Sequence, residues 1–134
     1  MNQGFGREKR LLEAKQFKAV FDSPDFRLSG RYILILARHN QLDHARLGLV
    51  VGKKNAKLAV TRNQIKRVFR ENFRLLQDEL PSVDMVIVTR RGIADLTASE
   101  LRQELVKQIK RLQRQSRAAN SSSSSVAQAG QSNA

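Results

Sequence analysis

The chain has 134 residues, which suffices for one domain with a modest core but not for two. Its 25 Lys and Arg residues outnumber 12 Asp and Glu, giving a formal net charge of +13, so we expect an anionic partner, and nucleic acid is the commonest polyanion in a cell. The lack of cysteine excludes disulfides and thiolate metal sites, and the lack of a signal core or of an apolar run of ~18 residues favours a soluble cytoplasmic protein without membrane contact.

The first half of the chain predicts one helix and three strands. Apolar residues recur at helical spacing over residues 11–21. Residues 31–40 are rich in β-branched and aromatic side chains, which favours a strand that is apolar on both faces. A short strand over residues 26–28 precedes it. Residues 46–52 predict its neighbouring strand, with residues 39–45 as a polar hairpin loop between the two.

The second half predicts two helices separated by a strand. Residues 58–80 favour a helix that ends before Pro81, because proline cannot continue a helix. Residues 83–90 predict a strand and residues 96–115 a last helix. The order α-β-β-β-α-β-α indicates an α+β fold, a two-layer sandwich of one sheet and its helices.

The last helix carries its own start signal and its own buried side. Thr97 and Glu100 have the spacing of a capping box. Its predicted buried residues are Leu101, Leu105, Ile109 and Leu112. We expect the folded domain to span residues 1–118. The Ser-rich residues 119–134 have too little apolar surface to offset the entropy of ordering them, so we predict a disordered tail.

The helix over residues 58–80 has one apolar side and one cationic side. Its apolar side contains Ile65, Val68, Phe69, Leu76 and Leu80, with Phe73 at the margin. Its cationic side, which we call the basic arc, comprises Arg62, Asn63, Lys66, Arg67, Arg70 and Arg74. A run of charge is usually a solvated surface, but this one lacks alternating sign and follows a loop that contains Lys53, Lys54 and Lys57. Arginine suits bidentate contact with phosphate, so the arc favours polyanion binding over plain solvation.

Aromatic residues on the first helix suggest a second surface. Phe17 and Phe21 are four residues apart and therefore project to one side of that helix. Together with Ile33 and Ile35 of the central strand they could stack bases of a single strand without sequence preference. The alternative, that both phenylalanines are ordinary core, is about equally compatible with the spacing. The cations Arg7, Lys9 and Arg10 could extend the same path.

The sequence offers no catalytic centre or metal site of its own. His39 and His44 flank a loop with Asp43 between them, but loop histidines are usually solvated rather than metal-bound. The remaining aspartates are scattered at predicted element boundaries, where Asp commonly caps or turns. We therefore predict no catalytic and no metal-ligating residue in this chain.

Residues 47–74, LGLVVGKKNAKLAVTRNQIKRVFRENFR, resemble the signature of the protein subunit of bacterial ribonuclease P. In that family a strand and a Lys-Lys loop lead into a helix marked Arg-Asn-Arg, Lys-Arg and Arg-Glu. Here Arg62-Asn63, Lys66-Arg67 and Arg70-Glu71 match, whereas Gln64 replaces the third residue of the triplet. The resemblance covers about residues 10–111.

The resemblance implies an accessory subunit of an endoribonuclease in which RNA does the chemistry. The family removes the 5′ leader of precursor tRNA, with Mg²⁺ held mainly by the RNA subunit and with no obligate protein partner. Its fold is of the ribosomal protein S5 domain 2-like type with a left-handed βαβ crossover. The RNA-subunit contacts carried over are Lys53, Lys54, Arg62, Asn63, Lys66, Arg67, Arg70 and Arg74. The leader-binding cleft carried over is Phe17, Phe21, Ile33 and Ile35.

Two other functions stay open on the residues alone. A structural ribosomal protein would use the same attraction between cations and RNA without any processing role. A DNA-binding module would place the basic helix in a major groove, although no helix-turn-helix partner precedes that helix.

Overall fold

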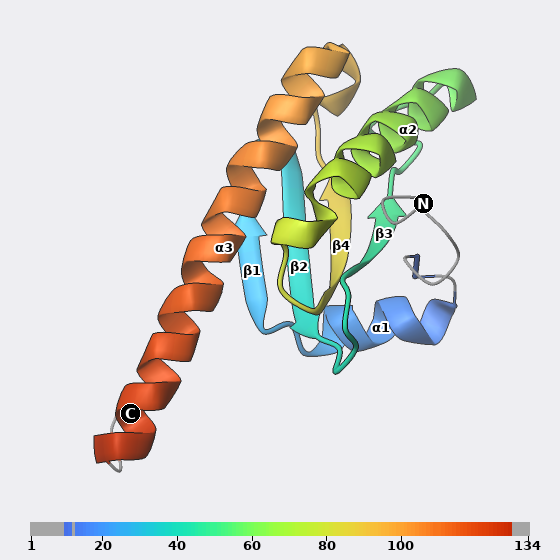
Figure 1. Cartoon of the computed structure of the whole chain (residues 1–134). Helices are drawn as coiled ribbons and strands as arrows, with labels where there is room; N and C mark the ends of the chain where they lie inside the picture. The colour runs from blue at the N-terminus through green and yellow to red at the C-terminus, as the bar shows by residue number, and fades with distance from the viewer. Residues whose placement is uncertain (1–9, 12, 130–134) are drawn as a thin grey trace.

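The computed structural model describes residues 10, 11 and 13–129, with side chains described as far as residue 118 (Figure 1). The elements follow the predicted order α-β-β-β-α-β-α. They are α1 (Ala14–Asp22), β1 (Phe26–Ser29), β2 (Ile33–His39), β3 (Arg46–Val50), α2 (Ala59–Leu76), the 3₁₀ turn η2 (Gln77–Glu79), β4 (Val83–Thr89), the 3₁₀ turn η3 (Ile93–Asp95) and α3 (Ala98–Ala129). The predicted α+β class is confirmed.

The four strands form one mixed sheet in the order β1-β2-β4-β3. β2 is antiparallel to β1 and β4, and β3 is parallel to β4. The predicted hairpin over residues 39–45 is therefore wrong, because β4 lies between β2 and β3. β4 is seven residues long and pairs with β2 along its whole length, so it occupies the centre and leaves the shorter β3 at the edge.

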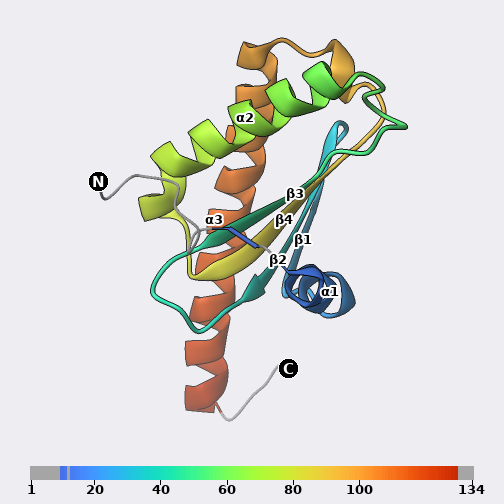
Figure 2. The same cartoon turned by 90° about the vertical axis from the view of Figure 1, so that its right-hand side faces the viewer.

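Helices cover both faces of the sheet. Figure 2 shows α2 and α3 on one side and α1 on the other. The larger core lies under α2 and α3 and includes Phe69, Phe73 and Leu105. A smaller core of Leu11, Val20, Leu36 and Val86 lies under α1. The predicted two-layer sandwich thus describes the sheet with α2 and α3, and α1 adds a partial third layer that the prediction omitted.

The first helix begins three residues later than predicted. Glu13 is its N-cap in a capping box, where the Glu13 N–H donates to Gln16 Oε1 at 3.0 Å. Leu11 precedes the helix and instead follows the edge of β3, because its N–H donates to the Leu47 carbonyl at 3.0 Å. The apolar residue that seemed to start the helical pattern therefore belongs to the smaller core.

The two long helices match most of their predicted features. The predicted helix over residues 58–80 consists of α2 followed by η2, and Phe73 is fully buried rather than marginal. The capping box of α3 is confirmed: the Glu100 N–H donates to Thr97 Oγ1 at 3.1 Å, and the Thr97 N–H donates to Glu100 Oε1 at 2.9 Å. The four apolar residues predicted for the buried side of α3 are all buried.

The predicted boundary between domain and tail falls within α3, which continues through the Ser-rich stretch to Ala129. Adding residues to an existing helix needs no new nucleation, so Ala, Gln and Ser can extend it at small cost. No helix in the part of the chain described here has both the length and the apolar character to cross a membrane.

Candidate RNA-binding surface

Helix α2 is anchored by one side and presents the basic arc on the other. Ile65, Phe69 and Phe73 are buried against the sheet. Arg67 and Asn63 are exposed on the opposite side, whereas Lys66, Arg70 and Arg74 are half-buried along the flanks. Long cationic side chains can rest their methylene groups on apolar surface while the charged ends reach solvent. The helix therefore turns Asn63 and Arg67 to solvent and leaves the other members of the arc partly exposed.

Arg62 holds the loop of residues 52–58, which we call the lysine loop because it contains Lys53, Lys54 and Lys57, against the start of α2. Its Nη1 donates hydrogen bonds to the carbonyls of Ala56 at 2.9 Å and Lys57 at 2.8 Å. Of the arc residues, Arg62 therefore has a structural role, and it fixes the loop from which exposed Lys53 and Lys54 project.

The first turn of α2 is open to anions. Its N-cap, Leu58, makes no side-chain cap, and no acidic residue lies in the first turn. The free N–H groups and the helix dipole at this end favour negative charge. Lys53 and Lys54 lie just upstream in the chain. The helix N-terminus and these two side chains therefore both contribute positive electrostatic potential at the start of α2.

A cationic hollow of about 410 Å³ lies further along α2, lined by Arg10, Arg67, Arg70, Glu71 and Arg74. Burial, and secondarily the positive charge of Arg10, lower the pKa of Arg70 from its ordinary value. Such crowding of like charges is relieved when an anion enters. Arg10 thus lies beside the basic arc and not along α1, while Arg7 and Lys9 fall outside the described residues.

The prediction that Ile33 and Ile35 face the first helix is wrong. Both are fully buried in the larger core, on the sheet face covered by α2 and α3. Side chains alternate along a strand, so the residues of β2 that face α1 are Leu34 and Leu36. Because β2 is apolar on both faces, the sequence did not reveal which face α1 covers.

Three half-buried apolar residues form an open row on the α1 face of the sheet. The strand register places Leu34 beside Val88 and Val88 beside Val50, and all three pack against the smaller core. We call Leu34, Val88 and Val50 the apolar row. Arg27 is exposed on the same face, since it pairs with Leu36. Alternate residues of β2 point to opposite faces of the sheet, so the sequence showed two sets of side chains. It did not show which of the two sets faces α1.

The two phenylalanines of α1 differ in exposure. Phe17 is half-buried and packs against the smaller core, where a Cβ on Gly48 would lie only 2.6 Å from its Cε2. Phe21 has 44% of its surface exposed. Phe17 therefore packs against the same smaller core as the apolar row, away from Ile33 and Ile35, whereas Phe21 is largely open to solvent on the same helix.

The titratable residues outside these surfaces make local contacts. His44 Nδ1 lies 2.8 Å from Asp43 Oδ1, and the His39 ring meets the edge of Phe26 at 5.5 Å between ring centroids. Asp84 is held by Arg46 and Asn40. Within the described residues, no three His, Asp or Glu side chains gather as metal ligands would.

Comparison with known proteins decides the family. A family model described as Ribonuclease P matches residues 5–113. The chain belongs to the ribonuclease P protein family. It is similar to the ribonuclease P protein component of Ectopseudomonas mendocina, with 60% identity over 112 residues and 84% of each chain covered. The component from Pseudomonas aeruginosa is 53% identical and matches over 84% of this chain and 83% of its own.

Solved ribonuclease P proteins have the same fold. The Staphylococcus aureus protein superimposes with a TM-score of 0.72 at 28% identity, covering 76% of this chain and 93% of its own. The Thermotoga maritima protein gives 0.68 at 31% identity, covering 76% and 96%. The chain is therefore a protein subunit of ribonuclease P, an endoribonuclease complex, and its role is in the 5′ processing of precursor tRNA. The ribosomal and DNA-binding alternatives are thereby disfavoured.

Proposed function

We propose that the basic arc, with Lys53 and Lys54, binds the catalytic RNA subunit, and that Phe17, Phe21 and the apolar row bind the single-stranded 5′ leader of precursor tRNA. One observation carries the first part: α2 buries one side against the sheet, while Lys66, Arg67, Arg70 and Arg74 stay at least partly exposed. The second part is supported by the half-buried apolar row, on which bases can stack, and by exposed Arg27 on the same face, which can contact phosphates.

In this proposal the two surfaces have separate tasks. Cations on α2 reduce the repulsion between the phosphates of two RNA molecules that must come together. The α1 face contacts the leader without reading its sequence, because every base has a face that can stack. Precursor tRNA would therefore gain affinity over mature tRNA, while the RNA subunit performs the hydrolysis.

We propose that the RNA subunit, not this chain, holds the catalytic Mg²⁺. Mg²⁺ needs carboxylate or phosphate oxygens in octahedral geometry. The described residues offer no such cluster of acids, so we assign no step to a metal held by the protein. We further propose that the particle works in the cytoplasm and needs no other protein.

We also propose that the fold is of the ribosomal protein S5 domain 2-like type, with a left-handed β3-α2-β4 crossover. Parallel pairing of β3 and β4 around α2 supports a crossover unit. In Figure 1 both strands point upward, and β4 lies to the left of β3. In Figure 2, α2 lies on the side of the sheet that faces the viewer in Figure 1. With β4 to the left of β3, this arrangement favours a left-handed crossover, which is the rarer hand.

The basic arc can be tested by reconstitution with the RNA subunit. We expect Lys66→Ala with Arg67→Ala to weaken assembly and to lower the slope of log affinity against log salt by about 0.7–0.9 for each phosphate that is no longer neutralised. Arg62 is left intact because it supports the lysine loop. The matched control is Lys107→Ala with Lys110→Ala, which removes the same charge from an exposed side of α3. Equal effects of both pairs would contradict a specific role for the arc.

The leader surface needs a different comparison. Phe21→Ala should weaken binding of precursor tRNA to the reconstituted particle by about 1–3 kcal/mol if a base stacks on the ring. Binding of mature tRNA should not change. Leu42→Ala, which trims another exposed apolar side chain, is the control. Equal losses for precursor and mature tRNA would rule out a leader contact at Phe21.

A further inference from the structure

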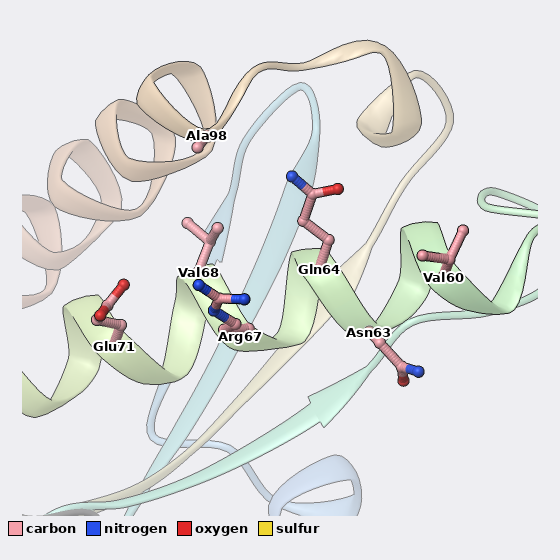
Figure 3. A pocket seen from close by; sticks show the side chains of 7 residues that line it. All are labelled: Val60, Asn63, Gln64, Arg67, Val68, Glu71 and Ala98. Carbon is pink, nitrogen blue, oxygen red and sulfur yellow. The ribbon is translucent and has the colours of Figure 1, made fainter.

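A second hollow lies on the side of α2 that faces the start of α3. It measures about 440 Å³ and is lined by Val60, Asn63, Gln64, Arg67, Val68, Glu71 and Ala98. Figure 3 shows Val60, Gln64 and Val68 projecting from α2 toward the side where Ala98 lies. Its size falls within the ~300–1,000 Å³ typical of small-ligand sites.

The walls of this hollow combine exposed apolar groups with groups that can form hydrogen bonds. Val60 is 70% exposed, so its methyl groups are accessible to a ligand. Gln64 projects between Val60 and Val68 and makes no side-chain hydrogen bond within the described residues. Its amide can donate and accept at once. A nucleobase has an apolar face, which can pack on the valine side chains, and a polar edge, which can form hydrogen bonds with the Gln64 amide.

The two hollows on α2 are adjacent and differ in chemistry. Arg67 and Glu71 line both of them. The hollow that faces α3 has apolar walls at Val60 and Val68, whereas the cationic hollow is dominated by Arg10, Arg70 and Arg74. A nucleotide has the same division, with an apolar, edge-polar base joined to an anionic phosphate. Because the two hollows share Arg67 and Glu71, they are contiguous, and one nucleotide can occupy both.

We propose that these hollows together hold one unpaired nucleotide of the RNA subunit. The base lies between Val60 and Val68 with its edge on the Gln64 amide, and the phosphate lies among Arg67, Arg70 and Arg74. The inference rests on the proposed contact between the basic arc and that RNA. It adds a contact that distinguishes an unstacked nucleotide from duplex RNA, whose bases are not available to such a hollow.

The test uses the complete chain reconstituted with its RNA subunit. Chemical probing of base edges along the RNA, with and without protein, identifies unpaired bases that the protein protects. Gln64→Ala and Val60→Ser are compared with Gln103→Ala, a control that removes an exposed glutamine from α3. Thermal denaturation checks that each variant folds, and Val60→Ala replaces Val60→Ser if it does not. Affinity is measured across a range of salt concentrations.

We expect both site variants to lose protection at the same single base and to bind about tenfold more weakly, with the salt slope unchanged because every cation that neutralises a phosphate is still present. Gln103→Ala should behave like the unmodified chain.

The outcomes separate the two proposals. If Lys66→Ala with Arg67→Ala lowers affinity but neither Gln64→Ala nor Val60→Ser changes protection, the nucleotide site is wrong and the basic arc stands. If Lys66→Ala with Arg67→Ala also changes neither the affinity for the RNA subunit nor its salt dependence, the proposed RNA contact itself is wrong. Protection that disappears only in Gln103→Ala would likewise overturn the site.

Discussion

At the scale of single residues, a missing side chain at Gly48 determines where Phe17 can lie. A Cβ on Gly48 would approach Phe17 Cε2 to 2.6 Å and Cζ to 2.7 Å, and Leu11 to 3.1 Å. The phenyl ring thus rests directly on the backbone of β3. Phe17 belongs to the proposed leader surface. Gly48 therefore affects that surface indirectly, by leaving room for the Phe17 ring.

Gly48→Ala should destabilise the fold by about 1–3 kcal/mol through overpacking, measured by urea unfolding. The same variant should weaken binding of precursor tRNA more than of mature tRNA, because Phe17 is displaced. Combining it with Phe17→Leu should recover part of the stability. A Gly48→Ala chain of unchanged stability would show that the ring moves aside without cost.

Asp84 and Arg46 form a well-buried ion pair, with side chains 13% and 21% exposed. Arg46 donates from Nε to Oδ1 and from Nη2 to Oδ2, each at 2.7 Å. The hydrogen bond to Asp84 raises the pKa of Arg46 against the opposing effect of burial. A pKa raised by folding favours the protonated group, so the pair stabilises the fold at neutral pH.

Asp84→Asn should therefore cost about 2–3 kcal/mol, because Arg46 keeps its charge without a charged acceptor. Denaturant unfolding measures the loss. Asp84→Asn with Arg46→Met should lose less than Asp84→Asn alone, since no charge is then left unpaired. A larger loss in the double variant would mean that the pair matters through packing rather than charge.

At the scale of elements, each of the long helices depends on a few polar contacts at its start. α2 has no side-chain cap and relies on Arg62, which ties the preceding loop to its first turns. α3 has the reciprocal Thr97–Glu100 capping box. The uncapped helix is the one proposed to meet phosphates, which is consistent with leaving its N–H groups available.

Thr97→Ala should destabilise the protein by about 1 kcal/mol, because the Glu100 N–H loses its acceptor. Ser99→Ala, in the same first turn and exposed, is the control and should change stability little. Differential scanning calorimetry distinguishes the two. Equal melting temperatures for both variants would mean that solvent replaces the cap fully.

At the scale of the whole molecule, a net charge of +13 affects stability and RNA binding in opposite directions. Like charges repel within the compact fold, so screening by salt stabilises it. The same screening weakens attraction to RNA phosphates. The free subunit is therefore least stable under the low-salt conditions in which it binds RNA most tightly.

Raising NaCl from about 0.02 M to about 0.2 M should shorten the Debye length and raise the melting temperature of the free protein. A gain of about 1 kcal/mol corresponds to roughly 3–6 °C for a domain of this size. Affinity for the RNA subunit should fall over the same range. A melting temperature that falls with added salt would indicate that attractive ion pairs outweigh repulsion.

Much of the fold was predictable because its local signals are strong. The four strands, the capping box of α3 and the cationic side of α2 follow from periodicity and from short-range spacing in the chain. The basic arc was also predictable, since a helix that buries Ile65 and Phe69 must turn Arg67 outward. These inferences need no knowledge of distant contacts.

The elements and the family signature could be predicted because each depends on residues close together along the chain, and the net charge follows from composition alone. Two features became known only from the folded chain: β4 separates β2 from β3, and α1 covers Leu34 and Leu36 rather than Ile33 and Ile35. The physical reason is that β2 is apolar on both faces, so alternation leaves its phase open. Pairing of β2 with β4 fixes that phase, and the bridge between Arg10 and Leu47 brings Arg10 beside α2.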